Sequence, residues 1–177
     1  IVSMRVDGAN DTILGGAGND VLLYIVPQRG LSIDLATGIA RDNPSSPDDS
    51  VSSIGVDSIG GFEYVFGSVN AGADTVDGRG GDDVVYLDAD GANDTVEGGT
   101  GADYLSYRPA GATRGVAIDL AQGVATDLPG TIGGSAGPGI GIDRISGFEI
   151  VEGTGVADLI LGSGAAETLI GGTGADS

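Results

Sequence analysis

Pairs of acidic residues nine positions apart are the feature of this sequence that could carry out chemistry. The pairs are Asp11 and Asp20, Asp74 and Asp83, Asp94 and Asp103, Asp158 and Glu167, and Glu167 and Asp176. Two carboxylates can serve as the acid and base of a glycosidase, or they can bind a hard cation. These carboxylates recur at a fixed period inside glycine-rich turns, which favours cation ligands over catalytic groups.

The composition narrows the choice of cation. The 177 residues include 26 acidic and 7 basic side chains, a net charge of −19, and neither His nor Cys. Zinc, copper, haem and iron–sulfur sites need imidazole or sulfur ligands, and calcium needs only oxygen. The same composition excludes covalent catalysis by Cys, His or Lys, so we expect a protein that is not an enzyme. Such an acidic surface also predicts no nucleic-acid partner and, without a long apolar run, no membrane insertion.

The carboxylates belong to a nine-residue repeat with three glycines, an Asp and then an aliphatic residue. Gly15–Leu23 and Gly98–Ser106 match the pattern Gly-Gly-x-Gly-x-Asp-x-aliphatic-x at every position, and Gly78–Tyr86 departs from it only at Arg79. This pattern is typical of calcium-binding parallel β-helices. Two full matches in one short chain make the signal specific.

The nonapeptides sit within a larger duplication. The matching segments are Gly8–Asp20 with Gly91–Asp103 and Gly164–Asp176, Arg29–Ala40 with Arg114–Ala125, and Val56–Gly67 with Ile142–Gly153. Pro/Ser/Gly-rich loops at Asn43–Gly55 and Pro129–Gly141 separate the last two pairs within each copy. We therefore expect residues 1–177 to form one repeat domain of a longer chain, with units at about 8–90 and 91–163 and a third unit that starts at 164.

Each nonapeptide is expected to form a six-residue turn followed by a three-residue strand. Two nonapeptides would make one coil of about 18 residues, with an aliphatic residue of each strand pointing inward and identical turns stacked on each flank. The step from Asp83 to Asp94 is 11 residues, which predicts a two-residue bulge at Leu87–Asp90. No segment shows helical periodicity with caps, so almost no helix is expected. Calcium between stacked turns would remove the repulsion within the column of carboxylates.

These nonapeptides and the segments between them resemble the RTX (repeats-in-toxin, haemolysin-type) calcium-binding proteins. The resemblance implies an all-β, right-handed parallel β-roll or β-solenoid with calcium-binding turns, type I secretion and folding outside the cell. In that family the Asp carboxylate and the carbonyls of turn glycines ligate Ca²⁺. Carried over to this sequence, the metal-binding residues are Asp11, Gly16, Gly18, Asp20, Asp74, Gly78, Gly80, Asp83, Asp94, Gly99, Gly101, Asp103, Asp158, Gly172, Gly174 and Asp176. Glu167 departs from the family's Asp.

Two functions fit this sequence at a higher level. The chain could be a structural region of a secreted or cell-surface adhesin, surface layer or other extracellular assembly, which the repeated units favour. It could instead be the non-catalytic, calcium-dependent C-terminal module of a secreted protease, lipase or polysaccharide-modifying enzyme. Calcium ions are the expected partners, with self-association or a surface polysaccharide as further candidates. Phe62, Tyr64, Phe66 and Phe148 could line a sugar site, but core packing or stacking on a strand is the favoured interpretation.

Overall fold

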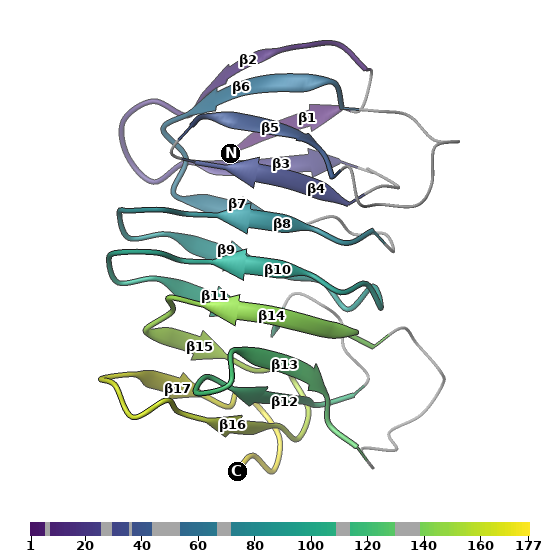
Figure 1. Cartoon of the computed structure of the whole chain (residues 1–177), viewed down its shortest axis with the longest axis vertical. Helices are drawn as coiled ribbons and strands as arrows, with labels where there is room; N and C mark the ends of the chain where they lie inside the picture. Colours follow the sequence, from purple (N-terminus) through teal and green to yellow (C-terminus); the bar gives the residue numbers. More distant parts are fainter. Residues whose placement is uncertain are drawn as a thin grey trace.

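The computed structural model shows strands arranged in two sheets (Figure 1). It describes residues 1–5, 8–25, 30–35, 37–43, 54–66, 72–108, 114–129 and 139–177, and these contain no α-helix. Sheet A consists, in spatial order, of β1 (Val2–Arg5), β3 (Val21–Ile25), β7 (Tyr64–Phe66), β9 (Val84–Tyr86), β11 (Tyr104–Ser106), β15 (Ile150–Glu152) and β17 (Thr168–Ile170). Sheet B consists, in spatial order, of β16 (Leu159–Leu161), β12 (Val116–Asp119), β13 (Val124–Asp127), β14 (Ile142–Ser146), β10 (Thr95–Glu97), β8 (Thr75–Asp77), β4 (Leu31–Asp34), β5 (Ile39–Asp42), β6 (Val56–Gly60) and β2 (Thr12–Leu14).

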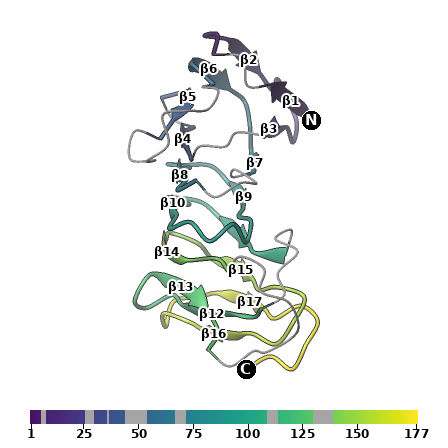
Figure 2. The same cartoon turned by 90° about the vertical axis from the view of Figure 1, so that its right-hand side faces the viewer.

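The nonapeptide strands form parallel coils. The chain passes from β8 to β9 and from β10 to β11, changing sheet each time, and Figure 2 shows the two sheets along opposite sides of the long axis. Val76 pairs with Val96 in sheet B, and Val85 pairs with Leu105 in sheet A. All four side chains are buried between the sheets, as expected from the inward-pointing aliphatic position.

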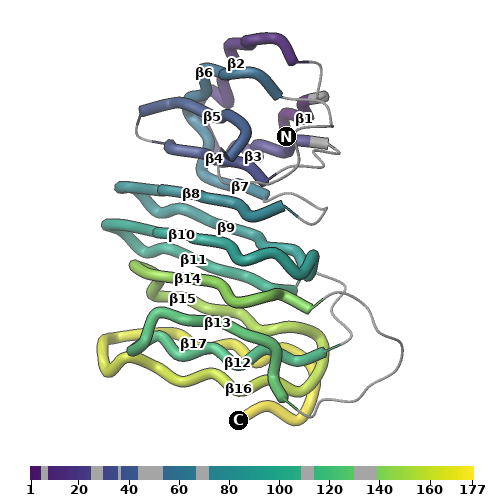
Figure 3. Tube along the Cα trace, turned by 45° about the vertical axis from the view of Figure 1, so that its right-hand side comes forward, coloured from purple at the N-terminus to yellow at the C-terminus, as the bar shows by residue number. Residues whose placement is uncertain are grey.

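Coil length follows the spacing of the acidic residues. Thr75 pairs with Thr95, so this coil has 20 residues, while Ile150 pairs with Thr168 across a coil of 18 residues. The two additional residues fall between β9 and β10, where the bulge at Leu87–Asp90 was predicted. Figure 3 shows the coils following one another along the long axis, with the two termini at opposite ends.

The duplicated segments between nonapeptides form antiparallel meanders, which the sequence did not predict. In the first copy β5 pairs antiparallel with β4 and β6, and in the second copy β13 pairs antiparallel with β12 and β14. Each meander therefore adds three strands to sheet B. The strand that follows the meander, β7 in the first copy and β15 in the second, belongs to sheet A. The buried rings of Tyr24 and Tyr107 help to fill the core beside the two meanders.

The core consists of the inward side chains of both sheets together with two phenylalanine rings, each from one turn. Phe62 and Phe148 are buried, which confirms core packing for these two. Tyr64 and Phe66 lie half-buried on β7, and Phe66 stacks on Tyr86 with ring centroids 4.4 Å apart. No described helix could span a bilayer. The centres of both predicted loops, 44–53 and 130–138, lie outside the described residues.

Candidate metal centre

The acidic residues gather into two columns of stacked turns, one on each flank. The flank-A column, which precedes the strands of sheet A, contains Asp20, Glu63, Asp83, Asp103, Glu149 and Glu167. The flank-B column lies at or just before the first residues of the sheet B strands, and the meander strands β4, β5, β12 and β13 divide it into three groups: Asp11 and Asp57; Asp74, Asp94 and Asp143; and Asp158 and Asp176. The structure thus places every Asp predicted as a metal ligand in one of these two columns.

Within a column, a carboxylate accepts a hydrogen bond from the backbone of the turn before it. The Asp83 N–H donates to Asp103 Oδ1 (2.9 Å), and the Asp103 N–H donates to Glu149 Oε2 (3.0 Å). On flank B, the Asp74 N–H donates to Asp94 Oδ1 (2.8 Å). The carboxylates therefore point along the column toward the neighbouring turn, as required for ligands shared between turns.

Four acidic members of the columns were missed in the sequence. They are Asp57, Glu63, Asp143 and Glu149. Each lies two positions before an inward aliphatic residue, as the nonapeptide Asp does, but only six residues separate the two acids within each meander coil. The turns that end at Glu63 and Glu149 are short and contain a buried Phe in place of the long glycine run. The pattern of an acid two positions before an aliphatic residue is present at these four positions. It was missed because the prediction relied on a fixed period of nine residues.

Glycines at Gly99 and Gly101 allow the turns to stack at close range. Their φ angles are 107° and 151°, a conformation that other residues rarely adopt. A Cβ at Gly99 would overlap the carbonyl oxygen of Arg79, and a Cβ at Gly101 would overlap that of Gly81. Carbonyl oxygens of one turn therefore face the backbone of the next. The Arg79 carbonyl already accepts the Thr100 N–H (2.9 Å), but a carbonyl oxygen has two lone pairs, so this bond does not prevent it from binding a cation as well. Arg79 itself adopts a φ of 67°, so the one departure from the pattern keeps a left-handed backbone.

Two carboxylates in this stack have a buried oxygen without a hydrogen-bond partner. They are Asp83 and Asp103, each at its Oδ2 atom, and both side chains are almost fully buried. Burial, followed by the charge of the nearby Asp103, raises the pKa of Asp83 to about 6. Burial also raises the pKa of Asp103, against the lowering effect of the Asp83 N–H bond. A buried carboxylate oxygen without a donor is unfavourable unless a cation or a proton neutralises it.

The donor set fits calcium better than other metals. The described residues contain no cluster of three or more carboxylate, His or Cys side chains that could hold an ion. A site in these turns must therefore combine one or two carboxylates with backbone carbonyls. Calcium accepts such mixed oxygen shells of six to eight ligands, whereas zinc and copper do not favour them. The orphaned oxygens of Asp83 and Asp103 and the closely stacked carbonyls are compatible with this ion.

On flank B, the carboxylates beside the meanders accept hydrogen bonds at both oxygens. Asp143 Oδ1 accepts the Asp94 N–H (3.0 Å), and its Oδ2 accepts the hydroxyl of the buried Tyr107 (3.0 Å). Asp57 makes the same two bonds in the first copy, to the Asp11 N–H and the Tyr24 hydroxyl. Burial, followed by the charges of Asp74 and Asp143, raises the pKa of Asp94 to about 9.

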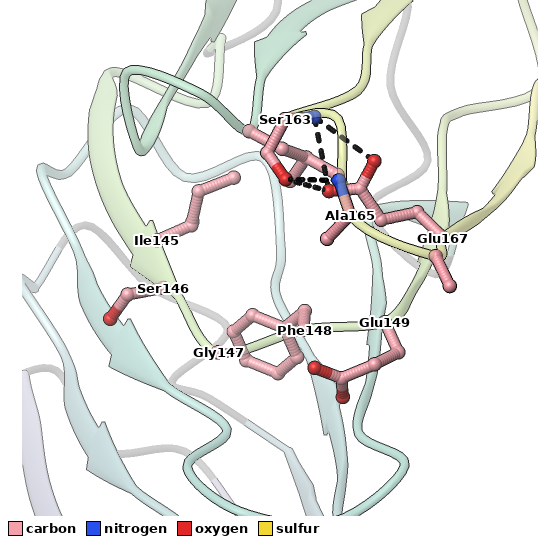
Figure 4. Close-up of a pocket in the computed structure, with 10 residues that line it drawn as sticks. Ile145, Ser146, Gly147, Phe148, Glu149, Ser163, Ala165 and Glu167 are labelled. Carbon is pink, nitrogen blue, oxygen red and sulfur yellow. Dashed lines mark hydrogen bonds between the residues drawn. The ribbon is translucent and has the colours of Figure 1, made fainter.

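The last predicted ligands lie together at the C-terminal end. Asp176 Oδ1 accepts the Asp158 N–H (3.0 Å), and the turn containing Gly172 and Gly174 stacks on the turn that begins at Gly153. The remaining predicted glycines, Gly16, Gly18, Gly78 and Gly80, lie in the flank-A turns that end at Asp20 and Asp83. A cavity of about 200 Å³ lies between the Phe148 turn and the Glu167 turn, where turns of unequal length meet (Figure 4).

The comparisons with known proteins agree with this geometry. A family model described as the RTX calcium-binding nonapeptide repeat matches four copies, at residues 5–23, 68–91, 88–106 and 145–177. These matches cover both central nonapeptides and about half of the chain. No curated protein matches the sequence significantly.

Proposed function

Because this chain belongs to the RTX calcium-binding nonapeptide repeat family, we propose that it is a structural region whose coils are joined by calcium in their glycine-rich turns. One observation carries the proposal: the buried, unpartnered Oδ2 atoms of Asp83 and Asp103 in directly stacked turns. The proposed fold is the right-handed parallel β-roll of this family, interrupted twice by the meanders.

The ligands would come from successive turns of flank A. Asp83 and Asp103 would contribute carboxylate oxygens, and the turn residues before them would contribute backbone carbonyls. Calcium supplies the positive charge that this part of the column lacks, since no described ion pair reaches either carboxylate. Asp20 has the same position in the first complete nonapeptide. Asp11, Asp74, Asp94 and Asp176 remain predicted ligands.

Calcium that binds only the folded coil would couple binding to folding. The stabilisation per site is RT ln(1 + [Ca²⁺]/Kd), about 2.7 kcal/mol at a hundredfold excess over Kd. Neighbouring coils share their turns, so the sites are coupled and the transition with calcium should be steep. A chain of this kind would stay unfolded where calcium is scarce and would fold outside the cell.

An adhesin, surface layer or other extracellular assembly is the proposed setting. The repeated architecture supports it, because both copies build the same meander and the same Tyr–Asp bond. The alternative is a calcium-dependent, non-catalytic module of a secreted enzyme. The flanking sequence of the gene separates the two: further repeat units support the first, and a catalytic domain supports the second.

Isothermal titration calorimetry tests the calcium assignment: the full chain is first freed of metal with a chelator and is then titrated with CaCl₂. Asp103→Asn keeps the shape of the side chain and the bond from the Asp83 N–H but removes the charge. We expect this variant to bind fewer ions, or to bind them at least tenfold more weakly. Asp119→Asn, at the end of β12 and outside both acidic columns, is the matched control and should bind like the wild type. Equal binding by all three proteins would contradict the assignment.

A further inference from the structure

In the turns of the last coil, the acidic side chains accept hydrogen bonds from a hydroxyl residue of their own turn. Thr154 and Ser163 take the second turn position, which is glycine in the nonapeptides that match the pattern fully. The Thr154 hydroxyl donates to Asp158 Oδ1 (2.8 Å) and the Thr154 N–H donates to Asp158 Oδ2 (2.7 Å). Asp158 Oδ1 also accepts the Val116 N–H (2.7 Å), so both of its oxygens have donors.

The Glu167 turn has the same arrangement on the opposite flank. The Ser163 hydroxyl donates to Glu167, and the Ser163 N–H lies 3.0 Å from both carboxylate oxygens (Figure 4). The Ala165 N–H donates back to the Ser163 hydroxyl (3.3 Å), as the Val156 N–H does to that of Thr154 (3.2 Å). Two independent turns therefore show one hydrogen-bonded motif.

The backbone differs from that of the open turns as well. At the fourth turn position Gly18, Gly81, Gly101 and Gly174 all have positive φ, between 121° and 151°. Val156 and Ala165 occupy this position in the two hydroxyl-containing turns, and neither has a positive φ. In these two turns the amide N–H of the fourth position donates to the hydroxyl of the second position.

We propose that a hydroxyl at the second turn position replaces calcium, so that the Asp158 and Glu167 turns are closed by the protein's own donors. A carboxylate with two or three charge-assisted hydrogen bonds is already compensated, and calcium would have to break them in order to bind. Asp83 and Asp103 differ in that each keeps a buried oxygen without a donor. The motif Gly-Ser/Thr-Gly-x-x-Asp/Glu then marks turns that do not require the ion.

This inference rests on the proposed function, and it replaces the sequence-based assignment of Asp158 as a ligand. It also explains how Glu167 is accommodated: its longer side chain folds back onto Ser163 of its own turn. The calcium-dependent part of the flank-A column would end at Asp103 and its neighbour Glu149. The last coil would be held by hydroxyl–carboxylate bonds.

The test compares the same chemical change in an open and a closed turn. Calcium stoichiometry is measured by equilibrium dialysis on the wild-type full chain, Asp103→Asn and Asp158→Asn. We expect Asp158→Asn to bind as many ions as the wild type, at an unchanged midpoint, and Asp103→Asn to bind fewer. A loss in Asp158→Asn equal to that in Asp103→Asn would overturn the inference.

A second variant tests the hydroxyl itself and does not depend on calcium binding at Asp103. Thr154→Val keeps the shape of this buried residue and removes the donor, so the thermal midpoint should fall by roughly 5 °C in saturating calcium. Thr95→Val, on the exposed face of β10, should leave the midpoint unchanged. If the wild type bound no calcium, the proposed function would be wrong. The midpoints of Thr154→Val and Thr95→Val would still decide whether the Thr154 hydroxyl stabilises its turn. Equal midpoints in the two variants would overturn that role.

Discussion

The close stacking of turns can be tested by adding one methyl group at equivalent positions of two nonapeptides. Gly101 and Gly18 both occupy the fourth turn position, with φ of 151° and 121°. A Cβ at Gly101 would overlap the Gly81 carbonyl oxygen, whereas a Cβ at Gly18 would meet nothing within 4 Å. Gly→Ala at either site introduces backbone strain of about 1–2 kcal/mol. Only Gly101→Ala adds a steric conflict with the next turn, of about 1–3 kcal/mol.

The assay is thermal unfolding of both variants in saturating calcium, followed by circular dichroism. For a chain of this size, an additional 1–3 kcal/mol lowers the midpoint by about 2–12 °C. Gly101→Ala should therefore unfold at a clearly lower temperature than Gly18→Ala, and it should also need more calcium to fold. Equal midpoints for the two variants would show that turns 78–83 and 98–103 are not stacked as described, and would refute the geometry on which the metal site depends.

Two further predictions concern buried groups. Tyr107→Phe removes the hydroxyl that donates to the buried Asp143, so it should lower the free energy of unfolding by about 1–3 kcal/mol. Tyr86→Phe is the control: Tyr86 is half-buried on β9, and its substitution should change the free energy of unfolding little in the same urea titration. In metal-free protein the folded-state pKa of Asp83 is about 6, above the ordinary value of 3.8 for an Asp carboxyl. The folded state then holds more protons between these values, so any β-structure that the metal-free chain keeps near pH 4 should be lost as the pH rises to about 6, which leaves the chain disordered at neutral pH. A gain of β-structure over this range would contradict the burial of that carboxylate.

The nonapeptides made most of this architecture predictable. Their spacing placed Asp83 and Asp103 in adjacent stacked turns, and the 11-residue step after Asp83 correctly indicated a 20-residue coil. These features were accessible because a residue's position in a repeating coil depends only on its position in the period. The family match confirms the nonapeptide repeats.

The meanders and the closed turns were not predictable in the same way. The segments around Ile33 and Ile59 alternate as strands do, but alternation does not reveal whether a strand pairs with a later coil or with its own neighbour. Glu63 was hidden because its turn is three residues shorter than a nonapeptide turn. Thr154 carried no recognised signal in the sequence, because its role depends on its hydrogen bonds to Asp158, which only the structure shows.

The most direct measurement is far-UV circular dichroism of the full chain, dialysed exhaustively against EDTA and then titrated with calcium. We expect a disordered spectrum in chelator at neutral pH and a steep, cooperative gain of β-structure as calcium is added, with magnesium far less effective. A chain that keeps the same β-spectrum without any divalent ion would contradict the claim that calcium holds the stacked acidic turns together.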